Sequence, residues 1–325
     1  MPLTDLPPGA LADYRPELPE PAGFDAFWAD TLREARAHTG EPELTPVRDA
    51  LLTSADVYDV RFPGWRGEPV AAWLLVPRGT GGPLPVVVEF LGYTGGRGLP
   101  TDRLLYSSAG YAHLVVDSRG QGHDTPDRGE GSGTQWAEGF MTRGIEDPRH
   151  HYYRRLMTDC VRAVDAVRAL PRADPERVAV AGGSQGGGLA LAVAGLAPGE
   201  IAGALIDVPF LCHYRRGVDV ASEGPYTEIA RYLRKHSPDR YESAFATLDH
   251  FDGVHFASRA SAPALFSAGL MDPVCPPSTV YAAYHRYAGQ REIRAWRCAD
   301  HGGGYGAQAR EQLLWLRARG LAPKG

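Results

Sequence analysis

The sequence predicts an α/β fold built around a doubly wound, mostly parallel sheet, and two observations lead to that class. Short apolar strand patterns alternate with amphipathic helix patterns over most of the chain, which is typical of parallel β-α units. One unit, at residues 178–196, passes from strand to helix through a short glycine-rich turn. The 325 residues fit one large α/β domain, and we find no linker that would divide them.

The elements are expected in a regular order. Residues 1–50 form an N-terminal extension, in which apolar residues at helical spacing predict a helix from residue 23 to about residue 38. Strands are expected at 57–62, 70–76, 85–91, 112–117, 177–181, 202–208, 262–268 and 292–296. Helices are expected at 153–170, 185–196, 277–287 and 305–319. A surface loop at 118–144 and a helical insertion at about 209–261 complete the expected fold.

Composition and charge exclude several classes of protein. With 43% hydrophobic and 22% charged residues, the chain resembles a soluble enzyme and not a disordered protein. The net charge of −5 is spread without blocks of like charge, which argues against a nucleic-acid or an anionic membrane partner. The longest apolar run, residues 189–197, is too short to span a bilayer. The N-terminus lacks the basic and apolar segments of a secretory signal, so a cytoplasmic protein is expected.

The cysteines give no sign of a metal site or a redox motif. Cys160, Cys212, Cys275 and Cys298 form neither a CxxC pair nor the spacing of metal ligands. In a cytoplasmic chain of this size we expect them to be reduced and packed in the interior. We therefore expect no bound metal and no other cofactor.

A candidate nucleophile lies in the turn between the strand at 177–181 and the helix at 185–196. Residues 182–186 fit the pattern G-x-S-x-G, with Ser184 in the middle. The pattern alone is weak, but a buried strand before it and a small-residue helix after it give the context of the nucleophile elbow of the α/β-hydrolase fold. Such an elbow raises the serine hydroxyl above the sheet edge, beside a helix N-terminus. The alternative is a plain glycine-rich turn between a strand and a helix.

A serine nucleophile needs a base and an acid, which follow it along the chain in this fold. Asp272 lies in the loop after the strand at 262–268, and His301 lies in a glycine-rich loop after the strand at 292–296. We favour this pair for the acid and the base. The rival acids are Asp207, at the end of an earlier strand, and Asp300, directly beside His301. The rival bases in loops are His123 and His213.

An oxyanion hole requires two backbone N–H groups that point at the developing negative charge. The residue after the nucleophile normally supplies one of them, which is Gln185 here. The second comes from the loop after an early strand, and Tyr93 occupies that place in the segment L-G-Y-T-G-G at 91–96. The alternative for this segment is an ordinary glycine-rich turn.

Taken together, these residues resemble the carbohydrate esterase family that contains acetyl xylan esterases and cephalosporin C deacetylases. The resemblance spans about residues 2–319. It is carried by an RGQ motif at 119–121, a GxSQG motif at 182–187, the segment D-V-P-F-L-C-H at 207–213 and the segment G-L-M-D-P-V-C-P-P-S-T at 269–279.

The resemblance implies roles for individual residues. Ser184, Asp272 and His301 would be nucleophile, acid and base, with oxyanion contacts at Tyr93 and Gln185. Phe210 and Pro225 would line the acyl pocket, and the motif Arg119, Gly120 and Gln121 would be structural, with Arg119 as an anchor near the site. The resemblance also implies a homo-oligomer, a ring-like hexamer whose inner cavity admits only small substrates.

The chain departs from the family in two places. The final family motif is usually His-Glu-Gly-Gly, whereas Gly302 follows His301 here. The base is kept, but a carboxylate that could brace the loop or an interface is lost. The segment 121–125 is also shorter than in some relatives, which would alter the pocket entrance.

These observations predict a serine carboxylesterase that removes acetyl groups from small acetylated sugars such as xylo-oligosaccharides, with cephalosporin C as a tolerated substrate. Two other classes of protein are alternatives. A peptidase related to prolyl oligopeptidase shares this fold, but about 55 residues before the first strand leave no room for a propeller domain. A binding protein that has lost catalysis would normally lack part of the Ser, Asp and His set.

Overall fold

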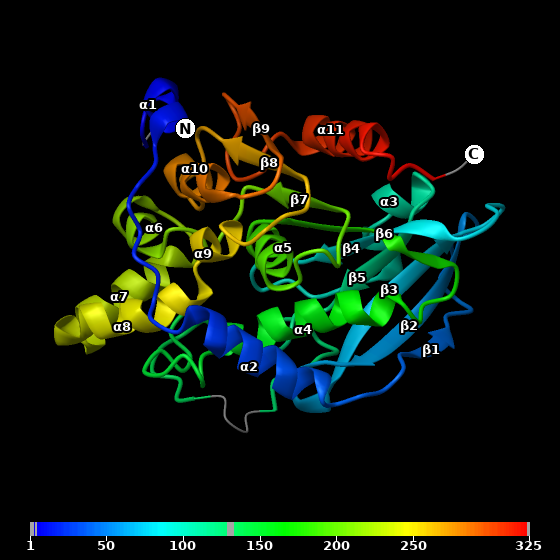
Figure 1. Ribbon diagram of the computed structural model, residues 1–325, viewed down its shortest axis with the longest axis horizontal. Coiled ribbons are helices and arrows are strands. Elements are labelled where there is room, and N and C mark those ends of the chain that lie inside the picture. The colour runs from blue at the N-terminus through cyan, green and yellow to red at the C-terminus, as the bar shows by residue number, and fades with distance from the viewer. Residues whose placement is uncertain (1–2, 4, 129–132, 324–325) are drawn as a thin grey trace.

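The computed structural model describes residues 3, 5–128 and 133–323. Its centre is a nine-stranded mixed sheet with the strand order β1-β2-β3-β5-β4-β6-β7-β8-β9 (Figure 1). The strands are β1 Glu43–Pro46, β2 Ala55–Pro63, β3 Pro69–Pro77, β4 Leu84–Phe90, β5 Ala112–Val116, β6 Ala173–Gly183, β7 Gly203–Asp207, β8 Ala264–Gly269 and β9 Arg291–Trp296. From β5 to β9 every neighbouring pair is parallel, while β1, β2 and β3 form an antiparallel extension at one edge.

Helices cover both faces of the sheet. They are α1 Pro8–Asp13, α2 Phe24–Arg36, α3 Leu105–Ser108, α4 Tyr152–Val167, α5 Gln185–Leu196, α6 Tyr214–Val220, α7 Tyr226–His236, α8 Tyr241–Leu248, α9 Gly253–Ala257, α10 Pro277–Arg286 and α11 Tyr305–Ala318. The larger core joins one face to α2, α4, α5, α9 and α10, and the smaller core joins the other face to α3 and α11 (Figure 1). This two-sided cover is the doubly wound arrangement that the alternating pattern predicts.

The side-chain period of the central strands explains why both faces are buried. Along β4, Val86 and Val88 pack into the larger core, while Val87 between them packs into the smaller one. Because successive strand residues point to opposite faces, a strand covered by helices on both sides must be apolar throughout. The continuous apolar run at 84–88 therefore fits a central strand.

Most expected elements are present, with differences at their ends. β6 begins at Ala173, four residues before the expected start, because Ala173 pairs with Leu84 of β4 although the residues that follow it are polar. The short strand β1 was not expected, since its residues are mostly exposed and carry little apolar pattern. Residues 129–132 of the expected surface loop lie outside the described part.

The segment expected to be a helical insertion, 209–261, contains α6, α7, α8 and α9 between β7 and β8. It packs on the larger core through aromatic residues of α6 and α7, among them Tyr214 and Tyr226. In the described part of the chain, no helix combines the length and the apolar character that crossing a membrane requires.

The prediction for the cysteines is right for three and wrong for one. Cys160, Cys212 and Cys275 are buried free thiols, but Cys298 is exposed. Cys298 lies in the turn that follows β9, where the chain runs along the surface. In such a turn no apolar core lies within reach of the Cys298 side chain, so the thiol stays exposed.

Candidate active site

The candidate nucleophile sits in a strained turn between β6 and α5. Ser184 has φ 59° and ψ −122°, a conformation that a residue with a side chain rarely adopts. Backbone hydrogen bonds hold it there: Ser184 N–H donates to the Asp207 carbonyl over 3.0 Å, and the Ser184 carbonyl accepts from the N–H groups of Phe210 and Gly188 over 2.9 and 3.0 Å. Helix α5 begins at the next residue, so the hydroxyl lies at a helix N-terminus.

Close backbone contacts explain the glycines of this motif. A Cβ on Gly182 would lie 2.3 Å from the Gly186 carbonyl carbon, and a Cβ on Gly186 would lie 2.1 Å from the Phe90 carbonyl oxygen. At Gly183, by contrast, a Cβ would meet no atom within 4 Å. The first and last glycines of G-x-S-x-G are therefore required for packing, whereas the position between Gly182 and Ser184 is sterically free.

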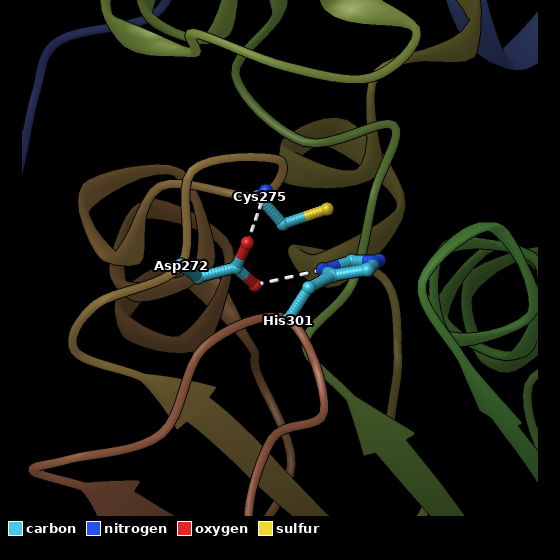
Figure 2. A group of neighbouring side chains, drawn as sticks. All are labelled: Asp272, Cys275 and His301. Atoms are coloured by element: carbon cyan, nitrogen blue, oxygen red, sulfur yellow. Dashed lines mark hydrogen bonds and ion pairs between the residues drawn. The ribbon is translucent and has the colours of Figure 1, made fainter. Parts of the chain in front are cut away.

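The candidate acid and base are hydrogen-bonded to each other. His301 Nδ1 lies 2.8 Å from Asp272 Oδ2, and Asp272 is supplied by the loop after β8 while His301 is supplied by the loop after β9 (Figure 2). The other carboxylate oxygen, Asp272 Oδ1, accepts from the N–H groups of Val274 and Cys275 over 2.8 and 2.9 Å. The Asp272 side chain is fully buried, and the His301 side chain is 31% exposed. The imidazole is thus held at Nδ1 by Asp272, while part of the ring is accessible to solvent.

Cys275 lies next to this pair and was not recognised as a site residue from the sequence (Figure 2). Its thiol is within 4.8 Å of an Asp272 oxygen and a His301 nitrogen. The Ser184 hydroxyl is within hydrogen-bonding reach of the same thiol. Burial raises the pKa of the Cys275 thiol well above its usual range, and the negative charge of Asp272 adds to the rise. The Cys275 thiol therefore lies near the nucleophile as well as near the acid–base pair.

One rival acid, Asp207, and one rival base, His213, are engaged elsewhere. The two oxygens of the buried Asp207 accept from the side-chain amides of Gln308 and Gln312 on α11, over 2.7 and 2.5 Å. Burial raises the pKa of Asp207 to about 7. His213 Nε2 lies 3.1 Å from the hydroxyl of Tyr14. These contacts leave Asp272 as the carboxylate that orients His301.

Asp300 has a structural task in the loop that carries His301. Its carboxylate accepts from the Gly302 N–H over 2.9 Å and from the Tyr305 hydroxyl over 2.6 Å. The Tyr305 ring takes the space above Gly302, since a Cβ there would lie 2.1 Å from Cζ of the ring. In this chain Asp300 and Tyr305 brace the loop in which the family motif has a glutamate.

Hydrogen bonds join the two expected oxyanion donors. The Gln185 side chain donates to the Leu91 carbonyl over 3.2 Å, so α5 is tied to the loop that carries Tyr93. Gln121 of the RGQ motif accepts from Thr94 N–H over 2.6 Å and donates to Gln185 Oε1 over 2.8 Å. Gln121 therefore bridges the two segments that would supply the oxyanion hole.

Tyr93 has a second anchor that sequence reasoning missed. Its hydroxyl donates to the carboxylate of Glu228 on α7 over 2.8 Å and accepts from Phe140 N–H over 2.7 Å. Burial raises the pKa of Glu228, and burial together with the Glu228 charge raises the pKa of Tyr93. The sequence gives no local sign of this contact, because Glu228 is three residues from Pro225 in a helical pattern that does not show which loop it faces.

The remaining expected residues lie around this centre. Phe210 is fully buried, and its ring is 6.1 Å from the Tyr93 ring and 4.5 Å from the Tyr226 ring. Pro225 is buried at the start of α7. Phe210 therefore packs directly against Tyr93, while Pro225 starts the helix that carries Glu228, the partner of Tyr93.

Arg119 is fully buried and forms ion pairs with two carboxylates. Its guanidinium donates to both oxygens of Asp159, over 2.6 and 3.0 Å, and also to Glu68. Gly120, with φ 68°, turns the chain between Arg119 and Gln121. Arg119 fixes the strand-β5 loop to α4, and Gln121 then reaches the oxyanion segments.

Comparisons with known proteins agree with this architecture. The family model for acetyl xylan esterase (AXE1) matches residues 1–319. The acetyl esterase Axe7A of Xylanibacter ruminicola is 27% identical over 311 residues, which is 93% of this chain and 68% of that protein.

Solved structures give the same result. An acetyl xylan esterase from Paenibacillus sp. R4 has a TM-score of 0.91 and 40% identity, covering 96% of this chain and 99% of that chain. Acetyl xylan esterase 1 from Thermoanaerobacterium sp. JW/SL YS485 has a TM-score of 0.88 and 33% identity, with the same coverage of both chains. The acylaminoacyl peptidase of Pyrococcus horikoshii shares the fold alone, at 17% identity and a TM-score of 0.61 over 84% of this chain and 42% of that chain. The chain therefore has the predicted α/β-hydrolase fold and belongs to the acetyl xylan esterase family of carboxylic ester hydrolases.

Proposed function

We propose that the protein is a serine esterase that removes acetyl groups from small acetylated carbohydrates such as acetylated xylo-oligosaccharides. The observation that carries the proposal is the strained Ser184 at the N-terminus of α5, next to Cys275, whose thiol lies within 4.8 Å of the hydrogen-bonded pair Asp272 and His301. Membership of the acetyl xylan esterase family supports acetyl esters as the substrate class.

In the proposed mechanism, His301 takes the proton of Ser184 while the serine oxygen attacks the acetyl carbonyl. Asp272 holds the imidazole in the tautomer with the proton on Nδ1 and stabilises the imidazolium that forms. The backbone N–H groups of Tyr93 and Gln185 receive the oxyanion, a contribution of about 3 kcal/mol for each donor. The alcohol leaves with the proton from His301, and water then hydrolyses the acetyl-enzyme with His301 as base.

The substrate proposal rests on the surroundings of the site. Tyr93, Phe210 and Pro225 would form an apolar wall suited to a short acyl group, and the polar sugar would remain on the solvent side of His301. An acetyl group on another small alcohol fits the same wall. Cephalosporin C, which carries such an ester, is therefore proposed as a tolerated substrate.

We also propose that the protein assembles as a homo-oligomer, with the hexamer of the family resemblance as the specific expectation. Light scattering tests it directly. A solution mass near six times 35.1 kDa would support the hexamer, and a mass near 35.1 kDa would reject any oligomer.

The experiment that tests the function compares the wild type with Ser184→Ala and with Ser243→Ala, which removes an exposed serine on α8. Acetate release is measured at about pH 7.5 from acetylated xylo-oligosaccharides and from p-nitrophenyl acetate. We expect Ser184→Ala to lose activity on both substrates by at least about 10⁴-fold and Ser243→Ala to keep it. Cleavage of p-nitrophenyl acetate alone would reject the sugar but keep the mechanism. An active Ser184→Ala enzyme would reject the mechanism.

A further inference from the structure

Three side chains of different chemistry, Asp272, Cys275 and His301, converge where the loops after β8 and β9 meet (Figure 2). Asp272 offers a carboxylate oxygen, Cys275 a sulfur and His301 a ring nitrogen, and these atoms all lie within 4.8 Å of one another. The Asp272 carboxylate accepts from the Cys275 N–H over 2.9 Å, so the loop itself fixes these two residues relative to each other. A hydrolase of this kind needs Asp272 and His301, but its chemistry has no task for a thiol.

The donor set has a clear metal preference. Sulfur and imidazole nitrogen suit zinc and similar soft cations, whereas magnesium and calcium prefer ligands made of oxygen alone. Zinc accepts Cys, His and Asp ligands in a tetrahedral arrangement, and three protein ligands leave the fourth position open. At the usual bond lengths of about 2.0 to 2.3 Å, neighbouring ligand atoms are roughly 3.5 Å apart. A closure of about 1 Å would therefore complete the site.

Rotation of the partly exposed His301 ring can supply that closure while its loop stays in place. His301 is 31% exposed, which gives a cation a path from solvent to the ring. Cys275 and Asp272 are both buried and form the fixed part of the site.

We infer that Asp272, Cys275 and His301 form a binding site for a thiophilic divalent cation, best matched by zinc, and that its occupation switches the esterase off. Binding displaces the thiol proton and any proton on the ring nitrogen that is used, and both go to solvent. If the cation takes Nδ1, it breaks the contact between His301 and Asp272. If it takes Nε2, it occupies the lone pair that would accept the Ser184 proton. In both cases the enzyme has no base.

The inhibition rests on the proposed function, whereas the binding does not. The first test measures zinc inhibition of p-nitrophenyl acetate hydrolysis, with each variant compared with its own zinc-free rate. We expect zinc to inhibit the wild type, EDTA to restore it, and Cys275→Ala to need at least about ten-fold more zinc. Cys298→Ser, which changes the exposed cysteine, is the matched control and should behave like the wild type. Equal zinc sensitivity of the wild type and Cys275→Ala would overturn the inference.

The second test does not need activity. Cobalt(II) replaces zinc in such sites, and a cysteine thiolate bound to it gives a charge-transfer absorption band in the near ultraviolet. We expect this band in the wild type and in Ser184→Ala, which keeps all three ligands, but not in Cys275→Ala. A missing band in the wild type, or its survival in Cys275→Ala, would overturn the site. A band in a folded protein that hydrolyses no ester would keep the site and reject the proposed function.

Discussion

The buried Asp272 carboxylate shows how single contacts position a reactive group. Removal of a carboxylate from water is costly unless hydrogen bonds replace the lost hydration. Here one oxygen receives two backbone N–H groups and the other receives His301 Nδ1. The backbone donors cannot rotate away, so the remaining lone pairs face the imidazole. The orientation of His301 follows from the local geometry of the loop after β8.

The contact between Glu228 and Tyr93 leads to a prediction about Tyr93 as the proposed oxyanion donor. Glu228→Ala leaves the Tyr93 hydroxyl without its acceptor. The Tyr93 side chain is then less firmly held, and the position of its backbone N–H becomes less well defined. Loss of a whole oxyanion donor lowers kcat by about 10² to 10³-fold, and we expect about ten-fold from its displacement, with KM little changed. Glu228→Gln keeps an acceptor oxygen and should recover most of the rate. The measurement is kcat and KM for p-nitrophenyl acetate.

Two results would contradict this positioning role for Glu228. One is a change in KM alone, which would indicate that Glu228 affects substrate binding. The other is an equal loss in Glu228→Gln and Glu228→Ala, because a neutral acceptor would then give no rescue.

At this scale, sequence reasoning finds residues that follow strands and misses residues that act across the fold. Asp272 and His301 could be paired because each follows a strand pattern, and the structure joins them by a hydrogen bond. Glu228 contacts Tyr93 across 135 positions of the sequence, from a helix that lies between two other helices along the chain. Cys275 looked like an ordinary packed thiol because the spacing of the cysteines shows no motif. Only the folded chain shows that its sulfur lies beside Ser184.

Among the elements, the turn between β6 and α5 gives the sharpest prediction. Gly186→Ala would place a Cβ 2.1 Å from the Phe90 carbonyl oxygen, which belongs to the backbone of β4 and cannot swing away. Overpacking of this kind costs about 1 to 3 kcal/mol of unfolding free energy, and we expect at least about 2 kcal/mol here. Urea unfolding measures it.

Gly183→Ala is the matched control, because Gly183 is exposed and a Cβ there meets no atom within 4 Å. We expect its unfolding free energy to stay within about 0.5 kcal/mol of the wild type. If both substitutions destabilise the protein equally, the glycines are needed for their backbone conformation and not because of the contact with β4.

Strong periodicity made most elements predictable, and its absence explains the misses. Helix α5 matches its expected bounds because its small apolar residues are bordered by clear turns. The start of β6 was missed because exposed polar residues there are held in the sheet by pairing with β4 and not by burial. β1 is a four-residue edge strand that is held by backbone pairing with β2. Because its side chains are mostly exposed, its sequence shows no apolar pattern.

Over the whole molecule, sheet order decides which loops meet. Parallel strands place their carboxyl ends at one edge, and Tyr93, Ser184, Asp272 and His301 follow β4, β6, β8 and β9 at that edge. The alternation of strands and helices predicts this gathering. The position of α7 could not be predicted, because the path of the helices between β7 and β8 depends on tertiary packing. That path brings Glu228 to Tyr93.

Buried histidines lead to a prediction about the stability of the whole molecule. His151 is fully buried at the start of α4, where Nδ1 accepts from Tyr153 N–H and Nε2 lies 3.1 Å from the Met141 carbonyl. One nitrogen must accept and the other must donate, so this environment suits only the neutral ring. Burial lowers the pKa of His151 to about 3.

The unfolded chain, with a His pKa of about 6.5, binds a proton between pH 3 and pH 6.5 that folded His151 does not bind. Its contribution to stability is thus complete above about pH 6.5 and is lost as the pH falls toward 3. The variant His151→Asn keeps a side-chain cap on α4 but has no imidazole to titrate. When the pH falls from about 7 to about 4.5, we expect the unfolding free energy of the wild type to drop by about 2 kcal/mol more than that of the variant.

Urea unfolding at the two pH values measures this difference, and the comparison of the two proteins removes the effect of other groups. Burial raises the pKa of Asp252 to about 6 and that of Asp207 to about 7, so these carboxyl groups favour folding at low pH and lose that contribution as the pH rises. Their effect opposes that of His151 but is the same in both proteins. The variant will be less stable at neutral pH, since Met141 loses a donor and the ring contact with Phe251 is lost. Equal pH dependence in the two proteins would mean that His151 takes up a proton in the folded state.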